Sequence, residues 1–149
     1  MSLIKTITLY LIAGPAISTF VFVMNFLFTK GGVANAFELI ALTLMASYAM
    51  SVYPPILMAS IGAASCVWLI TVQLKKYKLI KTPAALMLCV GLASSIFCSA
   101  WFSIISYLVG DSSSLLDWVF REVAPTGALL GMILGHKSAV IENKFKPLA

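Results

Sequence analysis

The chain has 149 residues, of which 61% are hydrophobic and 10% are charged, and its formal net charge is +5. An ordinary soluble domain is about 45–50% apolar and about 25% charged. A core built by so short a chain cannot bury this much apolar surface, so the composition excludes a soluble globular protein. We expect an all-α, polytopic transmembrane helix bundle, with residues 1–149 forming a single transmembrane domain.

The apolar segments are long enough to cross a bilayer, which takes about 20 residues of helix. The first covers about residues 6–28, and no small-residue cleavage site ends it before Lys30, so we expect a span rather than a signal peptide. A long apolar stretch follows and is broken at Pro54-Pro55 into segments of about 36–53 and 55–74. The last two segments cover about 82–109 and 118–136.

The number of crossings depends on the stretch Ala36–Leu74 and stays open at this point. If this stretch crosses twice as a hairpin bent at Pro54-Pro55, the chain has five spans and its N-terminus lies outside. If it crosses once and dips back once as a re-entrant half-helix, the chain has four spans and its N-terminus lies inside. Both models place the same number of Lys and Arg residues on the cytoplasmic side, and the terminal amine favours the second.

Lysines gather in two places that predict the orientation of the chain. The sequence "KKYKLIK" contains Lys75, Lys76, Lys78 and Lys81, and the tail after the last segment contains Lys137, Lys144 and Lys146. Basic loops stay in the cytoplasm, so we expect a multi-pass protein of the bacterial inner membrane with a cytoplasmic C-terminus. The same lysines are candidates for contact with lipid headgroups or with a soluble cytoplasmic protein.

Two rows of small residues recur at steps of four, where a helix places them on nearly one face. Helices in lipid associate through close backbone contact, which small side chains allow. We expect these rows to pack helices within or between protomers and to support a homo-oligomer, with the serines as an alternative polar strip along an aqueous path. The rows are Gly127, Gly131 and Gly135, and Gly91, Ser95, Ser99 and Ser103.

A short amphipathic helix is predicted at the outer interface, over about residues 114–123. Ser114 and Asp117 have the spacing of a capping box, and Asp117 and Arg121 are four residues apart, so they can pair on the wet face. We expect this helix to lie over the bundle at the level of the lipid headgroups.

Chemistry-bearing residues are sparse, and their pattern predicts no enzyme, no cofactor, no metal and no direct nucleic-acid partner. The three cysteines, Cys66, Cys89 and Cys98, all lie in apolar segments and are expected to be reduced thiols that pack. The single histidine, His136, is expected at a helix end. Glu38, near the start of its segment, is the best candidate for a proton site, because ionisable residues in spans are functional candidates.

Three stretches resemble a recurring pattern of small bacterial inner-membrane proteins: "YLIAGPAISTFVFV" (10–23), "SYAMSVYPPILMASIGA" (47–63) and "VAPTGALLGMILG" (123–135). In length and number of segments the chain is similar in outline to the membrane subunit of the Kiwa anti-phage defence system. That resemblance implies a small homo-oligomer that binds a cytoplasmic effector, and it carries over no catalytic residue.

We therefore expect a non-enzymatic, oligomeric inner-membrane subunit that anchors or signals to a cytoplasmic partner in anti-phage defence. The alternative is a small holin-like pore-former or a proton-coupled small-molecule transporter that uses Glu38.

Overall fold

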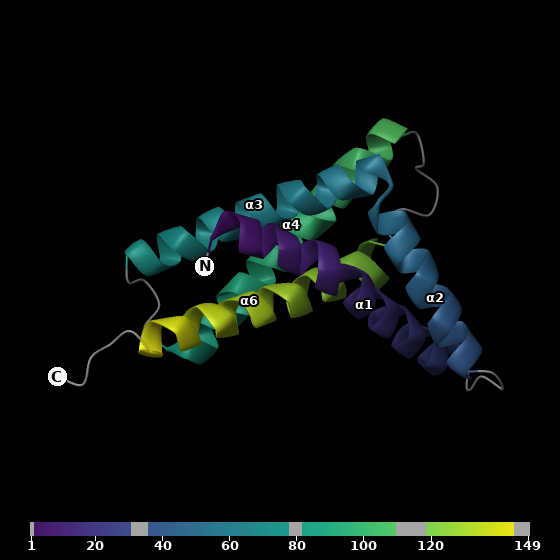
Figure 1. Cartoon of the computed structure of the whole chain (residues 1–149), viewed down its shortest axis with the longest axis horizontal. Helices are drawn as coiled ribbons and strands as arrows, with labels where there is room; N and C mark the ends of the chain where they lie inside the picture. The colour runs from purple at the N-terminus through teal and green to yellow at the C-terminus, as the bar shows by residue number, and fades with distance from the viewer. Residues whose placement is uncertain (1, 31–35, 78–81, 110–118, 145–149) are drawn as a thin grey trace.

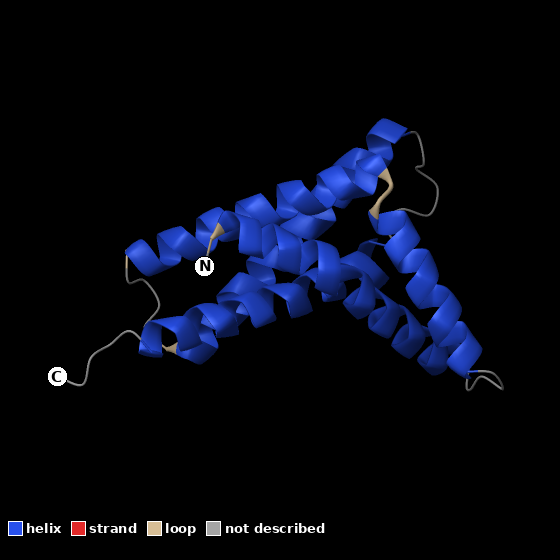
Figure 2. Cartoon of the chain, viewed as in Figure 1, coloured by secondary structure: helices blue, strands red, loops and turns tan. Residues whose placement is uncertain are grey.

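Helices form every regular element in the described part of this computed structural model, residues 2–30, 36–77, 82–109 and 119–144 (Figure 2). The all-α prediction is confirmed. In chain order the elements are α1 (Leu3–Lys30), α2 (Ala36–Ser51), α3 (Pro54–Lys76), α4 (Pro83–Val109), the π-helical turn η1 (Val119–Val123) and α6 (Ala124–Lys144).

Three helices are long and apolar enough to cross a membrane: Leu3–Thr29, Pro54–Lys76 and Pro83–Ile105. Apolar side chains point outward from them, for example Phe20 on α1 at 59% exposure and Leu92 and Ile96 on α4 at 65% each. Water disfavours such surface, whereas lipid tails accept it. The chain is a multi-pass membrane protein.

The two ends of the bundle differ in which connections they carry (Figure 1). At one end α1 begins, α3 ends, α4 begins and α6 ends, and we call this the lysine end. At the opposite, distal end α1 ends, α2 both begins and ends, α3 begins and α4 ends. Both ends of α2 lie at the distal end, so α2 does not run from one end to the other. The number of crossings stays a prediction.

Proline explains the bend in the middle of α1 (Figure 1). Pro15 lies inside this helix. It has no N–H to donate to the carbonyl four residues earlier, and its ring pushes that turn apart. The neighbouring carbonyl of Ile12 accepts a hydrogen bond from the Tyr48 hydroxyl of α2 at 2.8 Å. Thr19 Oγ1 donates to the Pro15 carbonyl at 2.9 Å and to Ser47 Oγ at 3.1 Å. These bonds from side chains tie α2 to the bent helix.

Glycines allow α4 and α6 to pack antiparallel at very short range. A Cβ on Gly127 would lie 2.9 Å from the Ser94 carbonyl oxygen, and one on Gly135 would lie 2.8 Å from Met87 Cα. A real side chain at either position would force the two backbones apart. This close approach places α6 directly beside α4, although α6 is not among the helices long and apolar enough to span a membrane by composition.

The core lies where α1, α3, α4 and α6 meet. Val67 and Val90 are fully buried, and Leu134 is 1% exposed. Small residues bring α3 close to its neighbours as well, since Ala59, Ala63 and Ala64 are buried and the Trp101 ring of α4 packs over Gly62. The helices are therefore held by small-residue contacts, as expected for association in lipid.

The segment before α6 differs from its prediction. Only its last part, from Val119, lies among the described residues, and there it is a π-helical turn that runs directly into α6. Ser114 and Asp117 lie outside the described residues, so their capping and their pairing with Arg121 stay predictions. The Arg121 carbonyl accepts a hydrogen bond from Asn25 Nδ2 of α1 at 2.7 Å. At its other end, α6 continues as a helix past His136 to Lys144.

Candidate functional site

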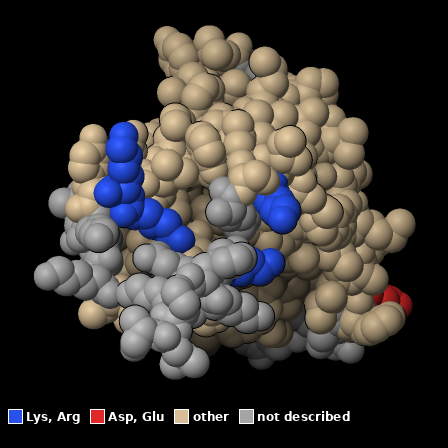
Figure 3. Space-filling model, turned by 60° about the vertical axis from the view of Figure 1, so that its left-hand side comes forward, with Lys and Arg blue, Asp and Glu red and all other residues tan. Residues whose placement is uncertain are grey.

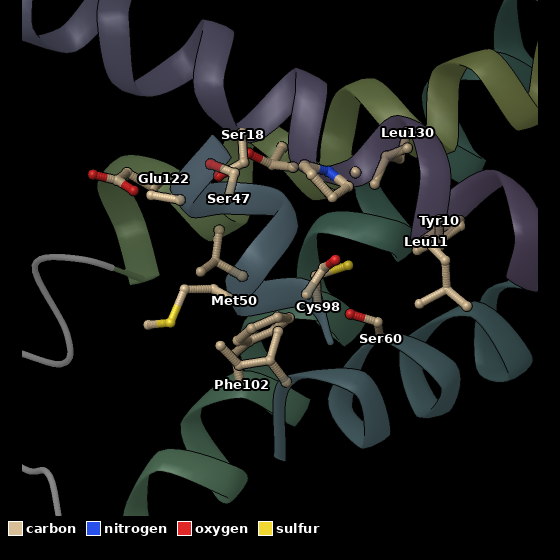
Figure 4. A pocket seen from close by; sticks show the side chains of 18 residues that line it. Tyr10, Leu11, Ser18, Ser47, Met50, Ser60, Cys98, Phe102, Glu122 and Leu130 are labelled. Atoms are coloured by element: carbon tan, nitrogen blue, oxygen red, sulfur yellow. The ribbon is translucent and has the colours of Figure 1, made fainter. Parts of the chain in front are cut away.

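A cavity of about 280 Å³ lies in the distal half of the bundle. Five elements form its wall: α1, α2, α3, α4 and the segment from η1 into α6 (Figure 4). The bend of α1 and the oblique course of α2 keep these helices from closing on one another. Most of the wall is apolar, with Leu11, Ile56, Phe102 and Leu130 among the lining residues.

Hydroxyl groups from every side form the polar part of this wall. They belong to Tyr10, Ser18, Ser47, Ser51, Ser60 and Thr126. Several of them retain unused hydrogen-bonding capacity. Ser47 Oγ accepts a bond from Thr19, which leaves its own proton to donate, and Thr126 Oγ1 is buried with no hydrogen-bond partner. In Figure 4, Ser18 and Ser47 lie close together, while Ser60 faces Cys98 deeper inside.

A buried polar cluster joins α1 to α4 at the deep end of the cavity. The hydroxyls of Tyr10 and Ser94 share a hydrogen bond, and Ser94 Oγ lies 4.0 Å from Cys98 Sγ. Ser94 is fully buried, so its hydroxyl depends on this partner. The cluster fixes the floor of the cavity and holds α1 against α4.

The cavity ends blind in the direction of the lysine end. One or two helical turns closer to the lysine end, Val67, Val90 and Leu134 fill the interior of the bundle. Each of these side chains is at most 1% exposed. Beyond them, the Lys75 ammonium donates to the Ser138 carbonyl at 2.6 Å and joins α3 to α6. A single chain in this arrangement therefore has no continuous path through it between these described helices.

The carboxylate at the cavity is Glu122 and not Glu38. Glu122 lines the cavity from η1, and in Figure 4 it lies at the edge, with its carboxylate directed away from Ser60 and Cys98. Glu38 is exposed in the first turn of α2, where a negative charge suits the helix N-terminus, and it does not line the cavity. A role of Glu38 as a proton site stays a prediction.

Lysines from three helices gather at the lysine end (Figure 3). Lys5 of α1, Lys76 of α3 and Lys137 of α6 are exposed there, and Lys76 lies 5.7 Å from the Tyr77 ring. Lys75 differs from the prediction, because its ammonium group is bonded inside the chain to Ser138. The remaining predicted contacts fall on Lys78, Lys81 and Lys146, outside the described residues, and on Lys144, whose side chain is not described.

The glycine row lies inside the protomer. Gly127, Gly131 and Gly135 are all buried against α4, so the row is not open to a second copy of the chain. The packing within the protomer that the row predicts is therefore what the structure shows, and a homo-oligomer stays a prediction.

The second row separates along α4. Gly91 is buried against Ala128 and Met132 of α6. Steps of four drift by about 40° each, or about 120° over three steps, so the row turns away from α6. The residues that α4 presents to the glycines of α6 are Met87, Gly91, Ser94 and Cys98. Ser95, Ser99 and Ser103 are half-buried, and their role in assembly stays a prediction.

The three cysteines are free thiols. His136 is exposed on α6. Among the described residues, no group of three or more His, Cys, Asp and Glu side chains is placed to hold a metal ion.

The sequence analysis predicts neither the cavity nor the place of Glu122 beside it. One feature of the sequence indicates such a cavity: the Gly-Pro pair of α1 lies opposite the serine-bearing α2, and a bent helix beside small polar residues leaves space. No family model, curated protein or solved structure matches the chain.

Proposed function

We propose that this protein is a non-enzymatic subunit of a bacterial inner membrane that holds a soluble, acidic partner protein at its lysine end. The observation that carries the proposal is the convergence of exposed Lys5, Lys76 and Lys137 from three helices on one face. Charged patches of one sign attract partners of the opposite sign and orient them. The resemblance to the membrane subunit of Kiwa suggests that the partner acts in phage defence.

Orientation is part of the proposal. The positive-inside rule places the lysine end in the cytoplasm, together with the two termini. Cysteines introduced at Ser2 and Lys137 in a cysteine-free background would both resist a membrane-impermeant maleimide added to intact spheroplasts. They would both react after the membrane is opened. Reaction of only one of them in intact spheroplasts would contradict this topology.

The partner is tested with defined proteins. Each soluble protein encoded beside the gene is co-expressed with the chain, and membrane flotation measures the fraction that rises with the vesicles. We expect Lys5→Gln, Lys76→Gln and Lys137→Gln together to lower that fraction at least fivefold, while the three Lys→Arg changes keep it. Flotation equal to that of vesicles lacking the chain would overturn the proposal, and so would full retention by the glutamine variant.

The cavity favours a second function, a carrier for a small molecule. The cavity is partly open, since Ala46 and Met50 of its lining are exposed, so a small molecule can reach it in this arrangement. In that case Glu122→Gln would abolish transport, and Glu38→Gln, on the exposed face of α2, would leave it unchanged. The reverse result would count against a role of the cavity in transport.

A further inference from the structure

We propose that the distal cavity binds a small, uncharged amphiphile, with an apolar body against the helices and a hydroxyl head among the serine and threonine hydroxyls. The juxtaposition that carries this inference is a mostly apolar, partly open cavity of about 280 Å³ into whose wall separate helices contribute hydroxyl groups. Binding at this site does not depend on a partner at the lysine end, nor on whether the molecule is carried across.

Size sets the first limit on the ligand. One water molecule occupies about 30 Å³ of the liquid, so the cavity holds about nine groups of that size. That is close to the lower end of the range for ligand pockets. A medium-chain alcohol with about eight carbons and one oxygen matches this volume.

The wall sets the charge. None of the described residues that line the cavity is Lys, Arg or His, so nothing there would compensate a buried anion. The carboxylate of Glu122 lies at the edge and points away from the inner hydroxyls (Figure 4). The groups that a ligand would meet inside are neutral donors and acceptors.

Thr126 indicates where the head of the ligand lies. Its Oγ1 is buried without a partner and lines the cavity at the start of α6. Buried hydroxyls in folded proteins are nearly always hydrogen-bonded. A ligand hydroxyl beside Thr126 would complete this bond, and Ser47 of α2, which also lines the cavity, keeps its own proton to donate.

The test uses the purified full chain in lipid nanodiscs and an octanol that carries a photoreactive diazirine on its chain. We expect the label to appear on peptides 10–18, 46–51 and 56–60, and to be displaced by excess unlabelled octanol. Labelling that is not saturable, or that follows the lipid-facing side of α4 around Leu92 and Ile96, would overturn the proposal.

Two variants locate the site without depending on one another. Ser60→Phe fills the cavity and should lower labelling at least tenfold, whereas Ser65→Phe, on the same helix but outside the lining, should not. Thr126→Val keeps the shape and removes a hydroxyl that makes no bond in the protein. It should therefore weaken displacement by octanol about threefold to tenfold and leave thermal stability unchanged. Unchanged displacement in Thr126→Val would show that the head does not lie there.

Charge is tested by competition between molecules of equal length. Octanol should displace the label at least tenfold better than octylammonium or octanoate. If octylammonium displaces the label better than octanol does, Glu122 binds a cation. If octanoate displaces the label better, the cavity accepts an anion. Either result would refute an uncharged ligand.

Discussion

Replacing Gly131 by alanine is the most direct test of how the bundle is held. A Cβ at this position would lie 2.5 Å from Ser94 Cβ and 2.8 Å from Gly91 Cα, and still closer to the Val90 carbonyl oxygen. Carbon atoms rest at about 3.5–4.0 Å from one another, so α4 and α6 must move apart by about 1 Å. Two of the three obstructing groups are backbone and cannot rotate away.

The expected loss of stability follows from that separation. A radial gap of about 0.5–1 Å already forfeits a quarter to a half of the dispersion energy across an interface. Overpacking of a well-packed core costs about 1–3 kcal/mol. We therefore expect Gly131→Ala to raise the unfolding equilibrium constant by about 5-fold to 150-fold. Gly131→Leu should be more severe, because its longer side chain has no space to enter.

The assay is unfolding in mixed micelles by titration with SDS, followed by tryptophan fluorescence. Trp101 reports on the bundle directly, since its ring packs over Gly62 between α3 and α4. Ala100→Leu is the control, because it adds more bulk than Gly131→Ala does, but on the exposed face of α4. We expect its midpoint to stay at that of the wild type.

Two results would refute this reasoning. An unchanged midpoint in Gly131→Ala would mean that the two helices are not as close as the structure has them. A change of oligomer size without a change of the midpoint would mean that the glycine row packs between copies of the chain and not within one.

Three further predictions concern the contacts that surround the cavity and the lysine end. Tyr10→Phe and Ser94→Ala should each destabilise the bundle by about 1 kcal/mol. A double-mutant cycle should give a coupling energy of about 0.6 kcal/mol or more between the two residues. Strictly additive losses of stability would show that the two hydroxyls are not bonded. Lys75→Met should lower the stability of the bundle by about 1 kcal/mol, because its bond to α6 is lost. Lys76→Met should change the stability by less than about 0.5 kcal/mol. Equal changes in stability would contradict the finding that only Lys75 is bonded to α6. Pro15→Ala should straighten α1. The distance between spin labels about 24 residues apart on α1 should then approach about 36 Å, the value for a straight helix. An unchanged distance would mean that Pro15 does not cause the bend.

Most of the fold follows from composition and length. Segments of about 20 apolar residues have one good solution in lipid, because a helix satisfies its own backbone. The predicted breaks at Pro54 and at the lysines after Leu74 agree with the observed helix ends within two residues. The predicted end of α6 is too early, since apolar periodicity fades there while Ala139 is still buried and the Ser138 carbonyl still bonds to Lys75.

Placement of the functional side chains could not be deduced in the same way. The four-residue spacing of Gly127, Gly131 and Gly135 predicts a tight contact but not its partner, because a helix of the same chain and one of a second copy offer the same chemistry. The sequence does not show which of Glu38 and Glu122 lies beside a cavity. The packing of η1 against α1 and α4 places Glu122 there.

The sequence by itself therefore determined the solvent, the helical state and the approximate ends of the helices, because each of these depends on local hydropathy and on backbone hydrogen bonds within one segment. The tertiary structure decided that both ends of α2 lie at the distal end, that the glycines of α6 pack against α4 and that hydroxyls from several helices line one cavity. These features depend on the bend at Pro15 and on which helix surfaces meet. Residues that meet from distant parts of the chain have no fixed spacing in the sequence, so their contacts cannot be deduced from it.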